Sequence, residues 1–294
     1  MTLTSPAPLR LRVPRLIATD LDGTFLSPDG TVSAENSAAV RAAQEAGIPV
    51  VFATGRPVRW LDVVKDLPGS HPVVIASNGA VLYDLGAGEL LDRVCIDPEV
   101  ALAAVDAVRA RVPGCSFAFD SGHRFGYEPT YQSFASKLAA DALRKLHEGH
   151  EPVLFSGTAD ELVHTCAFVK MLVQSADTAP DELLDLVRDA VGTTLTATHS
   201  MVGGSGLVEL SASGVSKASM LQRCCARLGV DAAHVAAFGD MPNDVAMLSW
   251  VGMPHVMANA HPLLLGGDYP VVPGNAESGV GRTILDLIER GRRE

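Results

Sequence analysis

The sequence predicts a doubly wound α/β fold, in which a mostly parallel sheet lies between helices and an α+β module is inserted into it. Short apolar runs that look like buried strands recur along the chain, and each ends in polar or small residues. Helical patterns alternate with them near both ends of the chain. Asp20 and Thr54, which end the first two runs, are 34 residues apart. That spacing is typical of one βαβ unit.

The elements of the sheet layer follow in order along the chain. Ser33 is a good N-cap for the first helix and Gly47 a good stop. Strands are predicted at 16–19, 49–53, 72–76, 234–238 and 269–272, and helices at 33–46, 58–67, 216–228, 243–250 and 281–290. Cys224 and Cys225 fall on the apolar face of helix 216–228 and are expected in the core.

The middle of the chain has a different pattern. Long helices are predicted at 98–111, 130–148 and 180–191, with strands at 116–119, 162–173 and 193–199. The chain is expected to leave the sheet after the turn Asn78-Gly79-Ala80 and to return near Ser211. We therefore predict three parts: 1–84 as the first part of the core, with 1–14 a loose tail; 85–210 as an inserted α+β cap; and 211–294 as the second part of the core.

Composition excludes several classes of protein. Of 294 residues, 47% are hydrophobic and 19% are charged, which is typical of globular proteins with room for two cores. The net charge is −11, and no Lys/Arg cluster indicates nucleic acid or an anionic membrane as a partner. Five cysteines without a CxxC pair favour a reduced cytoplasmic setting. No apolar run is as long as a membrane span, and residues 1–14 lack the apolar region of a signal peptide.

The motif Asp20-Leu21-Asp22-Gly23-Thr24 follows the first predicted strand. It should place two carboxylates at the carboxyl edge of the sheet, where open α/β sheets bind ligands. One carboxylate can attack and the other can move a proton, which is the minimum for covalent phosphoryl transfer. An EF-hand loop would need Gly and Glu where Phe25 and Thr31 stand. A plain turn rich in Asp and Gly is the remaining alternative.

Two further motifs offer donors for an anion. Thr54-Gly55-Arg56 ends the second strand with a hydroxyl and an unhindered N–H, which can hold a phosphate oxygen or simply form a turn. Lys217 lies in the first turn of a predicted helix, where a cation opposes the helix dipole. It is better placed there if it faces a bound anion, although a solvated surface lysine is an equal alternative.

The third strand of this kind ends at Asp240, and Asn243 and Asp244 follow where a helix begins. Either of the latter could be a simple N-cap. If Asp20, Asp22, Asp240 and Asp244 converge on one sheet edge, they repel each other and their pKa values rise. A divalent cation removes that conflict, and oxygen ligands with room for water and phosphate favour Mg²⁺.

In this order the four motifs resemble those of the haloacid dehalogenase superfamily of phosphotransferases. An insert of type IIB between the second and third motifs narrows the resemblance to the Cof-type phosphatases, as do the turn 78–80 and the segments 257–260 and 275–280. The resemblance covers about Arg15 to Arg290. One departure is Ala258, where relatives usually have glycine, and we expect it to alter only a turn.

The resemblance implies a Rossmann-like core with a cap, and it assigns roles to residues. Asp20 resembles the nucleophile and Asp22 the acid/base. Phosphate-binding positions correspond to Thr54, Gly55, Lys217 and Asn243. Ligands of Mg²⁺ correspond to Asp20, the backbone carbonyl of Asp22, and Asp240, with Asp244 holding the metal or its waters.

The expected activity is Mg²⁺-dependent hydrolysis of small phosphorylated metabolites, such as sugar phosphates, through an aspartyl phosphate. A phosphosugar mutase on the same core, or a regulator that binds a sugar phosphate without chemistry, are the alternatives. The physiological substrate and the choice between monomer and homodimer stay open. Specificity should come from the cap, whose candidate contacts are His123, Arg124, Glu128, Tyr131, Lys170 and His199.

Overall fold

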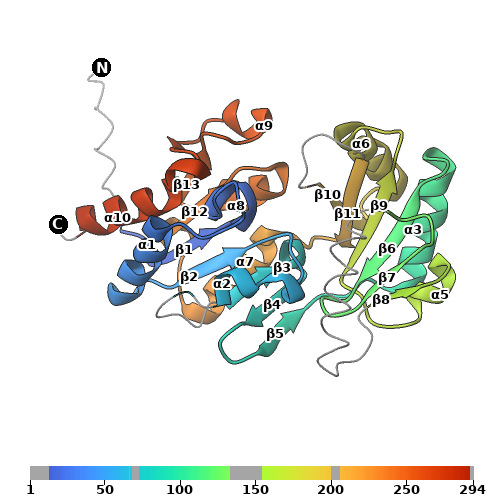
Figure 1. The fold of residues 1–294 in the computed structure, drawn as a ribbon, viewed down its shortest axis with the longest axis horizontal. Coiled ribbons are helices and arrows are strands. Elements are labelled where there is room, and N and C mark those ends of the chain that lie inside the picture. The colour runs from blue at the N-terminus through green and yellow to red at the C-terminus, as the bar shows by residue number, and fades with distance from the viewer. Residues whose placement is uncertain (1–12, 66, 68–72, 133–153, 200–205, 292–294) are drawn as a thin grey trace, which may run out of the picture.

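The computed structural model describes residues 13–65, 67, 73–132, 154–199 and 206–291, and it contains two sheets that lie side by side (Figure 1). Nearly all of the predicted helix, from residue 133 to 148, and nearly all of the predicted tail lie outside the described residues, and the first three positions of that helix, 130–132, are not helical. The predicted fold class, a doubly wound α/β core with an inserted α+β cap, is confirmed.

The first sheet has eight strands in the order β14-β13-β12-β1-β2-β3-β4-β5. The six from β14 to β3 are parallel, and β4 and β5 are added as antiparallel strands. Their bounds are β1 Leu16–Thr19, β2 Val50–Ala53, β3 Val73–Ala76, β4 Val81–Asp84, β5 Glu89–Arg93, β12 Val235–Gly239, β13 Met253–Met257 and β14 Val271–Val272.

Helices cover both faces of this sheet, because successive strand residues point to opposite sides. Ile17 packs in one cluster with helices α1 (Ala34–Glu45), α2 (Asp62–Lys65) and α10 (Gly279–Gly291). Its neighbours Leu16 and Ala18 pack on the other side, with α7 (Lys217–Leu228), α8 (Val245–Trp250) and α9 (Pro262–Leu265). Cys224 and Cys225 are buried in that second cluster, as the helical spacing predicts.

The second sheet has six strands in the order β10-β11-β9-β6-β7-β8, with only β7 and β8 parallel. The helices α3, α5 and α6 pack on one face. We call the eight-stranded sheet with its helices the first module, and the six-stranded sheet with its helices the second module. Phe125 and Leu172 lie on the opposite face of the second sheet, and Trp60 of the first module packs against them. The bounds are α3 Pro98–Arg111, β6 Ser116–Asp120, β7 Phe125–Tyr127, β8 Leu154–Ser156, α5 Ala159–Val163, β9 Lys170–Ser175, α6 Pro180–Val191, β10 Leu195–Thr198 and β11 Gly206–Ala212.

Several element predictions were wrong in detail. The predicted strand 162–173 is divided between α5 and β9, because Thr158 and Glu161 form a capping box that starts a helix at Ala159. The predicted helix 58–67 is a single turn, Val58–Trp60, followed by the short α2. The antiparallel pair β4 and β5 was not predicted.

The predicted boundaries of the insert, at 84 and 210, stay predictions. Strand pairing assigns β5 to the first sheet and all of β11, up to Ala212, to the second. We therefore propose that the chain crosses into the second module after Arg93 and returns after Ala212. In the described residues, no helix has both the length and the apolar character needed to cross a membrane.

Candidate active site

The predicted site residues follow strands that are neighbours in the first sheet. Thr19, the last residue of β1, is paired with Phe238 of β12 on one side and with Phe52 of β2 on the other. The residues that follow these three positions therefore meet at one edge of the sheet. This register brings Asp20 between Thr54 and Asp240.

The turn Leu21–Phe25 packs against the end of β12. Gly23 has φ +77°, and a Cβ there would lie 2.2 Å from a carboxylate oxygen of Asp240. The hydroxyl of Thr24 donates to Oδ1 of Asp240 at 2.6 Å. On the other side of the turn, Asn259 donates to the carbonyl of Gly23 at 2.8 Å and accepts from the N–H of Asn275 at 3.0 Å. The Asn259 side chain thus ties the motif turn to the last segment of the core, and Ala258 beside it leaves that contact intact.

Lys217 lies at the centre of the site. Its Nζ is 2.8 Å from Oδ1 of Asp20 and 2.7 Å from Oδ1 of Asp244, and its side chain is wholly buried. Burial alone would favour the neutral amine, but the two carboxylates outweigh it and raise the pKa of Lys217. The solvated-surface alternative for Lys217 is therefore wrong, while its predicted contact with a bound anion stays a prediction.

The first turn of α7 is held in place by its neighbours. Ser216 is the N-cap of α7 and exchanges hydrogen bonds with Ser219. Gly79, in the turn after β3, has φ +101°, and a Cβ there would lie 2.0 Å from the carbonyl oxygen of Ser216. Glycine is therefore required where the two turns touch, and this contact positions Lys217.

Asp244 is completely buried and both of its oxygens are occupied. Oδ2 accepts from the backbone N–H groups of Asp240 and Met241 at 3.0 Å each, while Oδ1 accepts from Lys217. Asp244 thus holds the loop after β12 and the ammonium of Lys217 together.

Three carboxylates at this edge could hold a metal ion. Asp20, Asp240 and Asp244 each offer an oxygen within 4.8 Å of the others. Burial, with repulsion from neighbouring carboxylates, raises the pKa of Asp20 well above its usual value and that of Asp240 to about 7. A divalent cation would relieve this repulsion, so the donor set fits a hard cation. Asp244 already has two sets of partners, which leaves the carboxylates of Asp20 and Asp240 as the freer donors.

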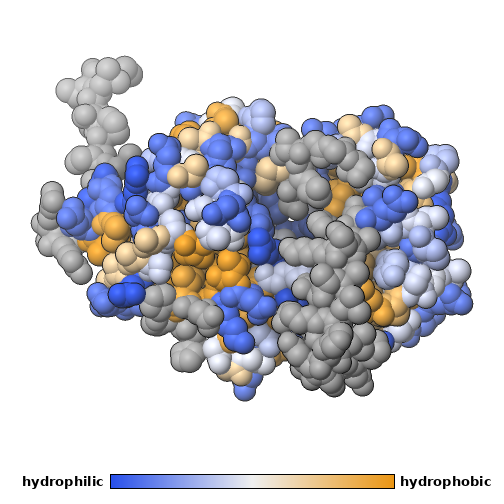
Figure 2. Space-filling view, in the orientation of Figure 1, coloured by the Kyte–Doolittle hydropathy of each residue, from blue (hydrophilic) through white to orange (hydrophobic). Residues whose placement is uncertain are grey.

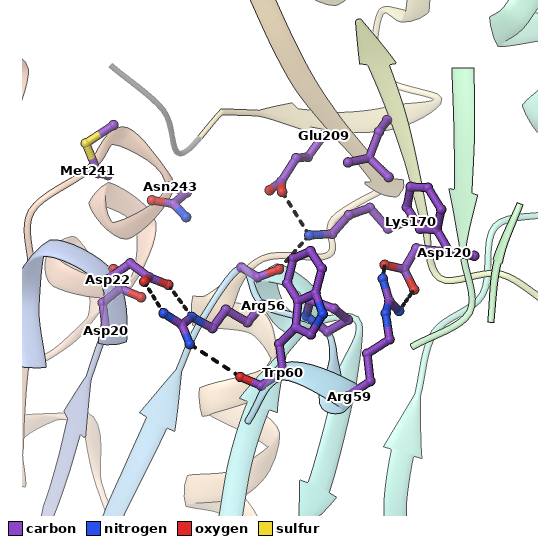
Figure 3. A pocket seen from close by; sticks show the side chains of 14 residues that line it. Asp20, Asp22, Arg56, Arg59, Trp60, Asp120, Lys170, Glu209, Met241 and Asn243 are labelled. Carbon is purple, nitrogen blue, oxygen red and sulfur yellow. Dashed lines mark hydrogen bonds and ion pairs between the residues drawn. The ribbon is translucent and has the colours of Figure 1, made fainter. Parts of the chain in front are cut away.

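The side chain of Asp22 turns away from these three carboxylates. It is 57% exposed and forms a two-pronged ion pair with Arg56, whose Nε lies 2.7 Å from Oδ2 and whose Nη2 lies 2.5 Å from Oδ1. Arg56 also donates to the carbonyl of Trp60 at 3.4 Å (Figure 3). The third member of the Thr54-Gly55-Arg56 motif therefore orients Asp22, a role that the sequence did not reveal.

The predicted phosphate-binding residues lie beside Asp20. Thr54 is buried, and its Oγ1 accepts from the N–H of Arg56 at 3.1 Å. Gly55 and Asn243 line the same cavity as Asp20 and Asp22. Asn243 is linked to the turn after β3, because its Nδ2 donates to Oδ1 of Asn78 at 3.0 Å.

A cavity of about 250 Å³ lies between the two modules and reaches the acidic edge (Figure 3). Its described lining combines Asp20, Asp22, Gly55, Arg56, Pro57, Arg59, Trp60 and Met241 with Asn243, Asp120, Phe125, Lys170, Leu172 and Glu209. The first module and the second module therefore both contribute walls. Figure 2 shows that the surface along this seam is mainly hydrophilic where it is not grey.

One buried ion pair and one hydrogen bond from a second buried ion pair join the modules at the cavity. Arg59, from the turn after β2, donates to both oxygens of Asp120 at 2.7 and 2.8 Å, and to the carbonyl of Gly122 at 3.1 Å. Lys170 of β9 donates to the carbonyl of Gly55 at 2.7 Å and to Glu209 at 3.0 Å. The structure thus brings Arg59, Asp120 and Glu209 to the site, none of which the sequence singled out.

Of the six cap candidates, Lys170 alone is among the described residues that line this cavity. Glu128 is bound by Arg109 and by the N–H of Phe117, and His199 is bound by Asp181. Arg124 lies over the ring of Phe155. The remaining two make ring contacts, His123 with Tyr83 and Tyr131 with Phe125.

Comparison with known proteins agrees with this geometry. The model of the haloacid dehalogenase-like hydrolase family matches residues 17–284, so the chain belongs to this family. YxeH of Bacillus subtilis, whose name places it among phosphatases, is 26% identical over 93% of this chain and 98% of its own length.

Solved structures show the same fold. SMU.1108c from Streptococcus mutans superposes with a TM-score of 0.78 at 22% identity, over 94% of this chain and 99% of that one. BT4131, a sugar phosphatase of subclass IIB, gives a TM-score of 0.74 at 19% identity, over 92% and 98%. These structures show the fold, a core with an inserted cap, and the family match with its phosphatase relatives makes the chain a phosphatase of the haloacid dehalogenase-like family.

Proposed function

We propose that this phosphatase hydrolyses small phosphorylated metabolites of the sugar-phosphate class in a Mg²⁺-dependent reaction, and that it works in the cytoplasm. The main observation in support is the buried carboxylate of Asp20, ion-paired with Lys217 at the end of the cavity between the two modules. The free thiols of all five cysteines agree with a reducing compartment.

In the first step, an oxygen of Asp20 attacks the phosphorus atom. A bond forms between that oxygen and phosphorus, the ester bond breaks, and Asp22 gives its proton to the leaving oxygen. In the second step, water attacks the aspartyl phosphate, its proton passes to Asp22, and phosphate leaves Asp20 as a carboxylate. Asp22 has to turn from Arg56 towards the ester oxygen, and its exposure leaves room for that rotation.

The phosphoryl group requires donors that are fixed before it binds. Thr54, Gly55, Asn243 and Lys217 are proposed to hold its oxygens, since they surround Asp20. Lys217 carries the one ammonium that touches Asp20 among the described residues. A buried ammonium stabilises the charge of the transition state more than an exposed one could.

We propose Asp20, Asp240 and the backbone carbonyl of Asp22 as Mg²⁺ ligands, with Asp244 supporting them. When bound, Mg²⁺ would offset the negative charge that the phosphate brings to the carboxylates. The raised pKa values of Asp20 and Asp240 support this assignment, because burial and the neighbouring carboxylates disfavour the charged forms more than Lys217 favours them, and a divalent cation would offset that.

The cavity supports a substrate whose leaving group is small and uncharged. Each cation in its described lining already has an anionic partner: Arg56 pairs with Asp22, Arg59 with Asp120, and Lys170 with Glu209. Apart from Arg56, which Asp22 leaves when it turns to the ester oxygen, a second phosphate or a carboxylate on the leaving group would find no unpaired cation among these residues. Hydroxyl groups can bind to such pairs, and a sugar ring can pack on Trp60 and Phe125.

The direct test is phosphate release from an aryl phosphate and from a panel of sugar phosphates, with Mg²⁺ and with excess chelator. We expect turnover with Mg²⁺, none in chelator, and at least a 10³-fold loss in Asp20→Asn, on the order of the losses seen when a nucleophile is removed. Activity of Asp20→Asn near that of the wild type would contradict the covalent mechanism. Transfer of phosphate within the sugar, without release, would indicate a mutase instead.

A further inference from the structure

Glu209 lies at the junction of the two modules and has no role in the chemistry above. It is a residue of β11, the last strand of the second sheet before the chain returns to Lys217. The residue is 8% exposed and lines the cavity. Its two carboxylate oxygens bind different partners, and each partner is itself hydrogen-bonded to a proposed phosphate-binding residue.

The first oxygen binds a lysine that reaches the first module. Oε1 of Glu209 accepts from Nζ of Lys170 at 3.0 Å, and the same ammonium donates to the carbonyl of Gly55 at 2.7 Å (Figure 3). Glu209 thereby fixes the ammonium that holds the Gly55 turn.

The second oxygen starts a chain of side-chain amides. Oε2 of Glu209 accepts from Nδ2 of Asn78, and Oδ1 of Asn78 accepts from Nδ2 of Asn243 at 3.0 Å. A carboxylate can only accept, so Asn78 must present its NH₂ to Glu209 and its oxygen to Asn243. The NH₂ group of Asn243 must then face Asn78, with one hydrogen left for another acceptor. Glu209 thus decides which way both amides point.

The turn that carries Asn78 cannot adjust easily. Ser77 and Asn78 have φ +51° and +55°, in the left-handed region that is rare for residues other than glycine. The N–H of Asn78 donates to the carbonyl of Thr54 at 2.9 Å, so the turn is also fixed to the phosphate-binding strand end. A change at Glu209 would therefore reach Asn243 rather than be absorbed by the turn.

We propose that Glu209 is a positioning residue that couples docking of the second module to the orientation of the phosphate-binding groups Asn243 and Gly55. This role rests on the proposed function of those two residues. When the second module is docked, Glu209 orders the amide chain and the Gly55 turn together. When it moves away, both contacts are lost, and the phosphate site is no longer aligned with Asp20.

The variant Glu209→Gln keeps the shape of the side chain at residue 209 and changes only the orientation of the amides that bind to it. The glutamine oxygen must face the Lys170 ammonium, so its NH₂ group faces Asn78. Asn78 then turns its oxygen to residue 209 and its NH₂ to Asn243, which reverses the amide of Asn243. Oδ1 of Asn243 has no hydrogen-bond partner among the described residues, so the reversed amide can form this bond.

The experiment measures kcat and KM with an aryl phosphate and Mg²⁺, the inhibition constant of inorganic phosphate, and the thermal midpoint. For Glu209→Gln we expect kcat to fall roughly 10- to 100-fold and phosphate to inhibit several-fold more weakly, since small misplacements cost about that much. Asn78→Gly keeps the positive φ and removes the side-chain amide, and it should lower kcat and weaken phosphate inhibition as Glu209→Gln does. The double variant should lose no more than the more impaired single variant, because both changes interrupt one chain.

Ser175→Ala is the matched control. Ser175 lies on β9 next to β11, is buried, and bonds Thr178 at 2.8 Å without touching the first module. It should lower the thermal midpoint and leave kcat and phosphate inhibition unchanged. The proposal is overturned if Glu209→Gln shows only a lower midpoint, as Ser175→Ala does, or if the losses in Glu209→Gln and Asn78→Gly multiply. A wild-type protein without phosphatase activity would instead refute the proposed function.

Discussion

The charges around Lys217 define the site at the level of single residues. One ammonium with no solvent exposure lies between two carboxylates, and a third carboxylate, Asp240, lies within the same group. A positive charge in that place offsets the carboxylates at rest, and in the proposed mechanism it would also stabilise a phosphoryl group beside Asp20.

We expect Lys217→Met to lower kcat by roughly 10²–10³-fold, because it removes one preorganised charge from the transition state. It should also lower the free energy of unfolding by about 3–5 kcal/mol, since Asp20 and Asp244 lose their buried partner. Steady-state kinetics and urea unfolding, both with Mg²⁺, measure the two effects. A fall in kcat of less than about threefold would show that this ammonium takes no part in the reaction.

The sequence predicted those site residues that follow strand ends in recognisable motifs. Asp20 and Asp240 were found in this way, and the register of β1 and β12 explains their meeting, whereas Lys217 was indicated by its place in the first turn of a helix. Asp120 and Glu209 were missed because what singles them out is a contact with the other module. Asp120 binds Arg59, which lies 61 residues away in the chain, and Glu209 binds Asn78, which lies 131 residues away. No local pattern marks a carboxylate whose partner lies so far away.

At the level of elements, the contact between α7 and the turn after β3 determines where Lys217 points. The backbone of Gly79 lies against Ser216, and there is no space for a side chain. The sequence showed a turn at 78–80 and a helix start at 216, but it could not show that they touch.

Gly79→Ala should therefore destabilise the protein by about 3 kcal/mol or more, the sum of strained left-handed backbone and a clash that the core cannot absorb. Activity should fall with it, as α7 is displaced. Gly88→Ala is the control, because Gly88 also has a positive φ, +71°, but has open space around its Cβ. It should cost only about 1–2 kcal/mol. Equal losses of stability in urea would show that the close approach to α7 is unimportant.

Among the other elements, the buried strands and the helices between them were predicted, whereas an exposed edge strand was missed. The alternation of β1, α1 and β2 was clear, because buried parallel strands are continuous apolar runs. The edge strand β5 was missed, since its exposed residues Glu89 to Arg93 lack both an apolar run and a clear alternation. Pairing with β4 makes it a strand.

At the level of the whole molecule, the two modules are joined by polar contacts that respond to pH. Burial alone would raise the pKa of Asp120, but the guanidinium of Arg59 and the N–H of Gly122 outweigh it, and the pKa is lowered. Because the folded pKa lies below the unfolded one, this pair stabilises the protein above about pH 4 and ceases to do so as the pH falls through the folded pKa.

Asp120→Asn should thus lower the free energy of unfolding at pH 7 by about 3–5 kcal/mol, because it leaves Arg59 buried without its counter-charge. The difference from the wild type should begin to shrink below about pH 4 and should continue to shrink as the pH falls through the lowered folded pKa, below which the wild-type carboxylate is itself protonated. Urea unfolding at pH 7 and at a series of acidic pH values below 4 measures this change. A difference independent of pH would mean that the ion pair contributes nothing beyond packing.

Metal binding should also stabilise the whole fold. If Mg²⁺ binds at the proposed ligands in the native state alone, Mg²⁺ at 100 times its dissociation constant adds about 2.7 kcal/mol to the free energy of unfolding. The thermal midpoint should rise with Mg²⁺ and return to its initial value on addition of chelator. Asp240→Ala should abolish most of this rise. An unchanged midpoint across a Mg²⁺ titration would argue against a metal at this edge.

The position of β1 in the sheet has a consequence for biosynthesis. β1 is made long before its neighbour β12, which begins only at Val235, and α1 is made long before α10, which packs on it and ends at Gly291. While the chain emerges from the ribosome, the first module therefore exposes one edge of β1 and the apolar face of α1 until β12 and α10 have been made. The second module, whose strands are continuous in the chain from Ser116 to Ala212, has all its partners earlier. The nascent chain should accordingly complete its insert before its core, and the unfinished core is the stage at which chaperones would be needed.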